Sequence, residues 1–306
     1  MPAFHLTNGS LSVIKEKKID LEKDVQSLTE KNLESVFGLE FISTEFHIEN
    51  FWIDTLAFDP EANSFVIIEY KKDQSFSVID QGISYLNTVL RNKADLILEY
   101  NEKTGKSLNR NSVDWNQIRV IFIAQRFTAH QQNSIGFRDF PIELWEVRLY
   151  ENNLVFFNEV KTPEVKETIA SLTKNKIVRE VAEQIKEYSF EDHVKKASDK
   201  IKPLLKELRE MIIALDSNVK EKPVRNYIGY KMNWYNFVTV HVYQQKIRIY
   251  VRKTTLQSDK SKRFKKVPES WAWGKTPIWY TEFTENKDLG YMMDAIKESY
   301  EAAPDK

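Results

Sequence analysis

The stretch FVIIEYKK at residues 65–72 constrains the fold more than any other part of the chain. Its first four residues are apolar and mostly β-branched, which is typical of a strand buried on both faces. Glu69 and Lys71 follow two positions apart. Because alternate residues of a strand point to the same face, this spacing places a carboxylate and an ammonium group together at the end of an otherwise apolar strand.

The segments around this strand predict an α/β sheet with flanking helices. Apolar residues at helical spacing predict a helix over residues 18–37, which Gly38 ends. Strand-like alternation follows at 41–48 and 51–58. Further along, the patterns predict one long amphipathic helix at 76–100, a buried strand at 115–125, and a strand with a hairpin at 142–157.

The second half of the chain changes character. Residues 161–200 are rich in Lys, Glu and Ala, and we interpret them as a charged helical connector between a first domain, 1–160, and a second domain, 201–306. The second domain is predicted to be a smaller α+β unit. Its expected elements are a helix at 201–215, a strand pair at 233–253, an extended segment at 271–283 and a closing helix at 288–303.

Composition limits the classes of function. The 306 residues hold 45 basic and 45 acidic side chains, so any footprint for nucleic acid must be a local patch. The absence of cysteine excludes disulfides, thiol catalysis and cysteine-bound zinc. We find no apolar core of a signal peptide and no run of 18 apolar residues, so we expect a soluble cytoplasmic protein with no membrane partner.

Three charged side chains on two adjacent strands suggest metal-dependent hydrolysis. Asp54 lies in the strand before Glu69 and Lys71. Two carboxylates supply the oxygen ligands that Mg²⁺ prefers, and the ion activates a water for attack on a phosphodiester. A lysine can orient that water or stabilise the developing charge. Gln81 and Tyr85, four apart in the next helix, share a face from which they can reach the same site.

Each of these residues also has an ordinary reading. Glu69 and Lys71 can be a solvated ion pair at a sheet edge, and Gln81 and Tyr85 can simply occupy a helix face. Glu22, on the first helix, is our candidate to complete the metal sphere, although a carboxylate there can equally interact with the helix dipole. Two further carboxylates compete with Glu22 for the metal role, namely Glu34 and Glu45.

The combination Asp54, Glu69-Tyr70-Lys71 and Gln81-x-x-x-Tyr85, preceded by EKDVQ and KNLESVFGLEF, resembles the PD-(D/E)XK restriction-endonuclease-like superfamily. Within it, the sequence resembles the group related to the archaeal and actinobacterial NucS mismatch endonucleases. The resemblance covers about residues 15–150 and implies a mixed central sheet flanked by helices, with cleavage of nucleic acid that depends on Mg²⁺ or Mn²⁺. It implies that Asp54 and Glu69 bind the metal, that Lys71 assists the nucleophile, and that Gln81 and Tyr85 support the site.

The C-terminal segments also resemble a known module. LLKELREMIIALDSNVKEKPVRNYIGYK, FVTVHVYQQKIRIYV and DLGYMMDAIKESYE are similar to DUF5655, a domain of unknown function, over residues 195–304. This resemblance identifies a module and implies no activity.

A basic stretch lies inside this module. Residues 246–266 hold nine Lys or Arg and one Asp, a composition that attracts phosphates. Aromatic residues on both sides could stack bases, and the alternative is a solvated loop beside an aromatic core. The residues we assign to nucleic-acid binding are Arg248, Arg252, Lys253, Lys262, Arg263, Lys265 and Lys266, with Trp234, Tyr235, Tyr250, Trp271 and Trp273 as the flanking aromatics.

The leading hypothesis is a two-domain, Mg²⁺- or Mn²⁺-dependent endonuclease that hydrolyses phosphodiester bonds, with DNA preferred over RNA as the partner. Whether the chain forms a homodimer stays open. One alternative is a non-catalytic nucleic-acid-binding protein on the same fold. The other is a protein-interaction or regulatory module, which the zero net charge favours.

Overall fold

The computed structural model describes residues 3–18, 22–72, 77–135, 141–161, 176–185, 188–267 and 277–303. The chain divides into two units. Unit 1 holds Met1–Asp59 and Asn63–Lys186, and unit 2 holds Pro60–Ala62 and Glu187–Lys306. Each unit has its own sheet, in agreement with the predicted order of an α/β part followed by a smaller α+β part.

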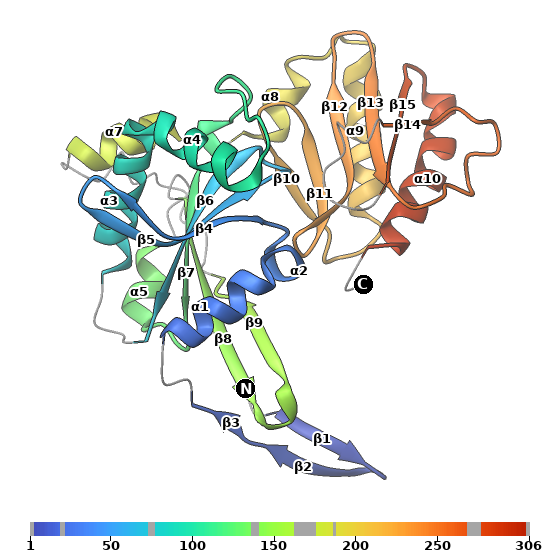
Figure 1. The fold of residues 1–306 in the computed structure, drawn as a ribbon. Helices are drawn as coiled ribbons and strands as arrows, with labels where there is room; N and C mark the ends of the chain where they lie inside the picture. Colours follow the sequence, from blue (N-terminus) through green and yellow to red (C-terminus); the bar gives the residue numbers. More distant parts are fainter. Residues whose placement is uncertain are drawn as a thin grey trace. The chain divides into compact units, whose positions relative to one another are not determined.

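The apolar stretch at residues 65–72 forms most of β6 (Ser64–Lys71), a central strand of a seven-stranded mixed sheet in unit 1 (Figure 1). The strand order is β3–β8–β7–β6–β5–β4, with β9 paired to β8. Strands β6, β7 and β8 are parallel, and the other pairs are antiparallel. The remaining strands of this sheet are β3 (Glu16–Lys17), β4 (Glu40–Ile48), β5 (Phe51–Asp59), β7 (Arg119–Ala124), β8 (Ile142–Tyr150) and β9 (Val155–Glu159).

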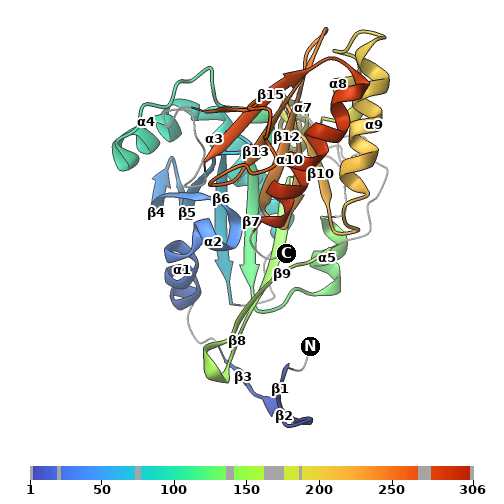
Figure 2. The same cartoon turned by 90° about the vertical axis from the view of Figure 1, so that its right-hand side faces the viewer.

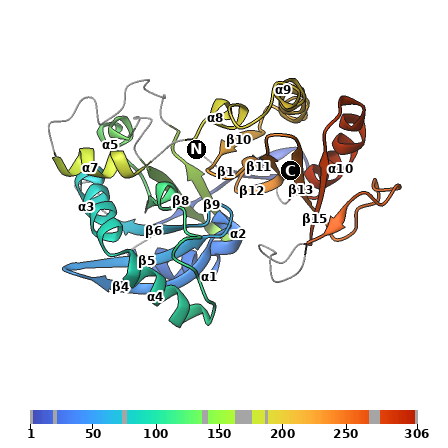
Figure 3. The ribbon, with the colours of Figure 1, turned by 90° about the horizontal axis from the view of Figure 1, so that it is seen from above.

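The side chains of β6 alternate between two apolar cores on opposite faces of the sheet. Phe65 and Ile67 join the core that α3 covers, whereas Val66 and Ile68 join the core that α1 and α2 cover. The same alternation directs Glu69 toward the α3 face. The helices of unit 1 are α1 (Glu22–Lys31), α2 (Leu33–Phe37), α3 (Val78–Arg91), α4 (Lys93–Thr104), α5 (Ala129–Ser134) and α7 (Lys176–Gln184), which packs against α3 (Figure 3).

Two helices that we predicted as continuous are each interrupted at an asparagine. The helix at 18–37 is α1 and α2, with Asn32 between them, and the helix at 76–100 is α3 and α4, with Asn92 between them. Each side-chain amide donates to the carbonyl four residues earlier, at 2.7 and 2.8 Å. An asparagine that bonds the backbone in this way competes with the helical pattern, which explains both breaks.

The predicted connector at 161–200 is divided between the units. In α7, Val178 and Val181 are buried in the core that α3 covers, and Ile185 follows them on the same apolar stripe. This stripe ties the helix to unit 1. Helix α8 (Phe190–Val194) already belongs to unit 2, so the boundary falls near residue 187. The segments 162–175 and 186–187 lie outside the described residues.

The N-terminus forms an element that we did not predict. Strands β1 (Ala3–Thr7) and β2 (Ser10–Ile14) make a separate antiparallel hairpin. Its two-residue turn is Asn8–Gly9, with φ of 50° and 81°. Positive φ at both positions is the requirement of a type I′ turn, which Asn-Gly satisfies at little cost.

Unit 2 contains a six-stranded antiparallel sheet in the order β10–β11–β12–β13–β15–β14. Helices α9 (Ile201–Ile213) and α10 (Leu289–Glu301) pack on its apolar face, and both match predicted helices. No helix within the described ranges has the length and apolar character needed to cross a bilayer. The strands are β10 (Lys220–Pro223), β11 (Ile228–Met232), β12 (Tyr235–Val242), β13 (Ile247–Arg252), β14 (Lys265–Lys266) and β15 (Ile278–Phe283).

Candidate active site

The pairing of β5 with β6 brings two predicted carboxylates together. The antiparallel pairing of these strands ends at Thr55 and Ile68, one residue before Asp54 and Glu69. Beyond this point the side chain of Asp54 reaches across to the backbone N–H of Tyr70, the residue after Glu69. Asp54 and Glu69 are therefore neighbours on adjacent strands, close enough for the charge of Glu69 to act on Asp54.

The carboxylate of Glu69 is buried, and only one of its two oxygens accepts hydrogen bonds. The residue is 3% exposed, and its Oε1 accepts hydrogen bonds from Lys71 Nζ at 2.7 Å and Gln81 Nε2 at 2.9 Å. Its Oε2 is buried and has no hydrogen-bond partner among the described residues. A buried charged oxygen without a donor is costly, so this atom marks a place where a ligand would be favourable.

Asp54 is held beside Glu69 at an electrostatic cost. Its Oδ2 accepts a hydrogen bond from the backbone N–H of Tyr70 at 3.0 Å. Burial, and then the negative charge of Glu69, raise the pKa of Asp54 to about 6, although the Tyr70 hydrogen bond and the charge of Lys71 oppose the rise. Two acidic groups in one partly dry site therefore repel each other and favour a cation between them.

Helix α3 supplies the polar partners of this pair. Ser77 caps its first turn by accepting a hydrogen bond from Asp80 N. A Cβ at Gly82 would collide with the end of the Ile142 side chain, so glycine lets the helix approach the sheet this closely without displacing Ile142. The approach brings Gln81 to Glu69, and the amide of Gln81 also donates to the hydroxyl of Tyr85 at 3.0 Å.

Tyr85 extends the network to the edge of β5. Its hydroxyl donates to the carbonyl of Trp52 at 3.2 Å, two residues before Asp54. Burial raises the pKa of the Tyr85 phenol, with the charge of Glu69 as the next cause, so Tyr85 stays a neutral donor. The structure thus connects Glu69, Gln81, Tyr85 and the Asp54 strand through consecutive hydrogen bonds.

Sequence reasoning missed Gln26. This buried residue on α1 donates through Nε2 to the carbonyl of Asp54 at 2.8 Å and to Thr44 Oγ1 at 2.9 Å. It therefore fixes the backbone that carries Asp54 from the opposite side of the sheet. The available signal was a polar residue, next to Val25, on the apolar face of the first predicted helix.

Glu22 lies near this site but in a different setting. It is exposed at the start of α1, and its Oε1 accepts a hydrogen bond from Lys72 N at 2.6 Å. Its negative charge raises the pKa of Asp54 less than burial and the charge of Glu69 do. In the part of the chain that the structure describes, no group of three or more His, Asp or Glu side chains is arranged to hold a metal ion. Glu34 and Glu45 are exposed, and Glu45 pairs with Lys23 at 3.5 Å.

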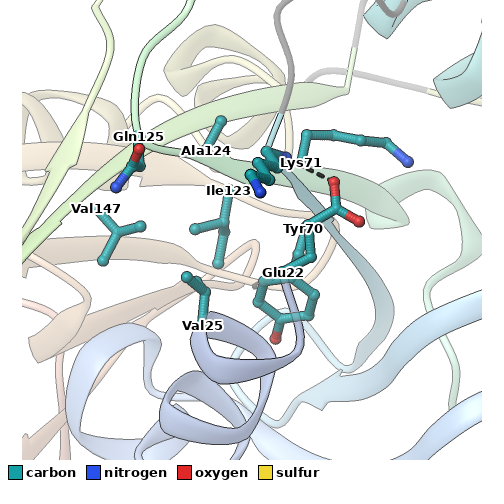
Figure 4. A pocket seen from close by; sticks show the side chains of 9 residues that line it. Glu22, Val25, Tyr70, Lys71, Ile123, Ala124, Gln125 and Val147 are labelled. Carbon is teal, nitrogen blue, oxygen red and sulfur yellow. Dashed lines mark hydrogen bonds between the residues drawn. The ribbon is translucent and has the colours of Figure 1, made fainter. Parts of the chain in front are cut away.

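A small recess lies between α1 and the ends of β6 and β7 (Figure 4). It places Glu22 on the α1 side of the sheet, whereas Glu69 points to the α3 side. Lys71 contributes to the recess and also donates to Glu69, so it adjoins both features. The apolar side chains of the recess include Val25, Ile123 and Val147, and its polar ones include Glu22, Lys71 and Gln125.

Most of the basic residues that we assigned to nucleic-acid binding have acidic partners within unit 2. Arg252 is 8% exposed, and its guanidinium lies 2.6 Å from Glu61, which belongs to the Pro60–Ala62 segment of the same unit. This burial removes Arg252 from direct contact with a phosphate. The other pairs are Arg248 with Glu282, Lys253 with Glu298 at 3.1 Å, and Arg263 with Asp288 at 2.9 Å.

The remaining three basic residues, Lys262, Lys265 and Lys266, are exposed. Of the flanking aromatics, Tyr235 is buried in the core of unit 2 and Trp234 packs against that core, which is the ordinary reading of these side chains. Trp271 and Trp273 lie outside the described residues.

Comparison with known proteins shows the family of the chain. An uncharacterized protein of Haemophilus influenzae (strain Rd) is 38% identical over 303 residues, which cover 98% of this chain and 99% of that protein. The chain therefore belongs to the same family as the Haemophilus protein. Residues 190–303 match the model of a domain of unknown function, DUF5655, which confirms the predicted resemblance of the C-terminal part.

Two solved structures show a weak similarity. A repair endonuclease from Pyrococcus abyssi aligns with 16% identity and a TM-score of 0.26, over 43% of this chain and 50% of that one. A complex of EndoMS with double-stranded DNA aligns with 15% identity and a TM-score of 0.25, over 42% of this chain and 47% of that one. The chain thus spans about half the length of these proteins.

Proposed function

We propose that the chain is a metal-dependent nuclease of the PD-(D/E)XK restriction-endonuclease-like superfamily, which hydrolyses phosphodiester bonds of nucleic acid, DNA in preference to RNA. The observation that supports this proposal is that Asp54 and Glu69 are neighbours on adjacent strands, with Asp54 Oδ2 bonded to the backbone N–H of Tyr70. Glu69 keeps one buried oxygen without a donor and offers the other to Lys71 and Gln81.

The donor set fits Mg²⁺ or Mn²⁺. Mg²⁺ is usually held by only one or two carboxylates, together with waters and phosphate oxygens of the substrate. Asp54 and Glu69 would supply the two carboxylates, Glu69 through Oε2. A cation there would oppose the repulsion that contributes to the raised pKa of Asp54. When bound, such an ion polarises a phosphate oxygen and lowers the pKa of a coordinated water.

The surrounding side chains orient this pair. Gln81 and Lys71 both hold Oε1 of Glu69, which restricts rotation of the carboxylate and fixes the direction of Oε2. The side chain of Lys71 is 20% exposed, so its ammonium group can also approach a substrate phosphate and stabilise negative charge on it. Gln26 holds the Asp54 backbone from the other face.

Trp52 supports a nucleic acid as the substrate over a small phosphodiester. This residue is 61% exposed and lies two residues before Asp54. The bond from Tyr85 to its carbonyl fixes the backbone at this point. An exposed indole beside the site can stack on the base next to the scissile phosphate, a contact that tolerates any sequence.

Cleavage assays test the proposal. Purified protein is incubated with single-stranded, duplex and branched DNA and with RNA, in Mg²⁺, in Mn²⁺ and in EDTA. We expect metal-dependent cleavage that is lost in Asp54→Asn and in Glu69→Gln. Glu102→Gln, which alters an exposed carboxylate on α4, is the matched control and should cleave normally.

Undiminished cleavage by either site variant would rule the mechanism out. Salt-dependent binding without cleavage in any metal would instead support a non-catalytic nucleic-acid-binding protein. Neither binding nor cleavage would leave a protein-interaction role as the better account.

A further inference from the structure

A chain of buried hydrogen bonds lies behind the candidate site, on the face of the sheet that α1 covers. Helix α1 packs beside β5 and β6 (Figure 2). The side chain of Tyr70, between Glu69 and Lys71 in β6, points toward this helix and joins the core that α1 and α2 cover (Figure 4). Thr55 and Tyr70 are 0% and 1% exposed, so their hydroxyl groups need partners inside the protein.

These hydroxyl groups form a directed chain that ends on Glu30 of α1. Thr55 Oγ1 donates to Glu30 Oε1 at 2.6 Å. Because a threonine hydroxyl has a single proton, the Tyr70 hydroxyl must be the donor in its 3.2 Å contact with Thr55 Oγ1. Burial raises the pKa of the Tyr70 phenol, so this proton stays in place. The order of donation is therefore from Tyr70 to Thr55 and from Thr55 to Glu30.

The members of this chain also hold Asp54. The backbone N–H of Tyr70 donates to Asp54 Oδ2 at 3.0 Å, and Thr55 directly follows Asp54 in β5. Gln26 Nε2, which donates to the carbonyl of Asp54 at 2.8 Å, also donates to Glu30 Oε1 at 3.2 Å. A single oxygen of Glu30 thus contacts two groups that fix the chain at Asp54, namely the Thr55 hydroxyl and the Gln26 amide.

We propose that Glu30, Thr55 and Tyr70 are positioning residues, which fix the direction in which the Asp54 carboxylate faces a divalent cation. This inference rests on the proposed nuclease function and deepens it. The backbone pairs of β5 and β6 end at Thr55 and Ile68, so beyond that point side-chain bonds hold Asp54 in place. Outer partners of this kind orient a metal ligand, and their loss typically weakens metal binding by about 10–100-fold.

The affinity of the metal-free full chain for Mn²⁺, measured by calorimetry at about pH 8, tests the positioning role. Thr55→Val keeps a strand-favouring residue of similar size but removes the hydroxyl that links Tyr70 to Glu30. Its Mn²⁺ affinity should fall by about 10-fold or more. Thr55→Ser keeps the hydroxyl, so it should restore most of the affinity.

A second pair of variants separates positioning from a general loss of stability. Tyr70→Phe removes the first donor of the chain. Tyr100→Phe is the matched control, because it removes another buried tyrosine hydroxyl of unit 1, which donates to Glu40 Oε2 at 3.0 Å. Urea unfolding in EDTA should show a loss of stability in both variants, but only Tyr70→Phe should also weaken Mn²⁺ binding.

The possible outcomes separate this inference from the proposed function. Mn²⁺ affinity that is unchanged in Thr55→Val or in Tyr70→Phe overturns the positioning role but leaves the proposed metal site standing. Equal weakening by Tyr100→Phe overturns it as well, and so does a Thr55→Ser variant that binds as weakly as Thr55→Val. A wild type that binds no Mn²⁺ removes the metal site itself, and this inference with it.

Discussion

Replacing Asp54 by Asn should stabilise the metal-free protein, and the gain should depend on pH. The pKa of Asp54 is raised from 3.8 to about 6 on folding, by burial first and by the charge of Glu69 second. A rise of about two pKa units corresponds to about 3 kcal/mol. Because the pKa is raised, the folded state holds its proton more tightly than the unfolded state does. Ionised Asp54 therefore lowers the free energy of unfolding. This cost is absent below about pH 4, grows between about pH 4 and pH 6, and is complete above that range.

The asparagine amide keeps an oxygen that can accept the hydrogen bond from Tyr70 N, but it carries no charge. Since a buried amide also has to lose water, only part of the penalty is recovered. We expect Asp54→Asn to raise the free energy of unfolding of unit 1 by about 2 kcal/mol at about pH 8, and to leave it unchanged near pH 4. For a unit of this size, that gain raises Tm by about 4–8 °C.

Thermal and urea unfolding in EDTA, followed by circular dichroism at both pH values, measures this difference. Glu102→Gln, an exposed carboxylate in the same unit, is the control and should show no pH-dependent gain. Equal stabilisation by Asp54→Asn at both pH values, or none at the higher one, would refute the electrostatic account of the site.

Three further substitutions test the neighbours of the pair. Gln81→Ala removes one of the two donors to Glu69 Oε1, so cleavage should fall by about 10–100-fold in kcat/KM with little change in stability. Trp52→Ala should weaken binding of single-stranded DNA by about 1–3 kcal/mol in fluorescence titrations, whereas Trp52→Phe should keep most of the affinity. Gly82→Ala forces a methyl group against Ile142, so urea unfolding should show unit 1 destabilised by about 1–3 kcal/mol.

Periodicity alone predicted the elements that carry the candidate site. The apolar run before Glu69 specified a buried strand, and alternation in the segment before it specified the strand of Asp54. A local pattern cannot predict which residues distant in the sequence contact one another across the sheet. Gln26 contacts the carbonyl of Asp54 from a residue 28 positions away, and no spacing rule links the two. Glu22 was assigned to the metal from its place in a helix, but the sheet lies between it and the α3 face.

The differences between the predicted and the observed elements can be traced to particular residues. Asn32 and Asn92 each interrupt a helix because their amides bond the preceding turn, an effect that a hydrophobic pattern cannot reveal. The Asn8–Gly9 turn was a readable hairpin signal, since apolar residues alternate on both sides of it. The ion pair of Arg252 could not be predicted from the sequence, because its partner Glu61 is far away along the chain.

The binding of Mn²⁺ to the metal-free chain tests the central claim most directly. At about pH 8, above the raised pKa of Asp54, the Asp54 carboxylate is ionised and ready to bind. Calorimetric titration of the full chain should show Mn²⁺ binding in the wild type and in Glu102→Gln, and its loss in Glu69→Gln. Binding that persists unchanged in Glu69→Gln would contradict the claim that this buried carboxylate binds a divalent cation.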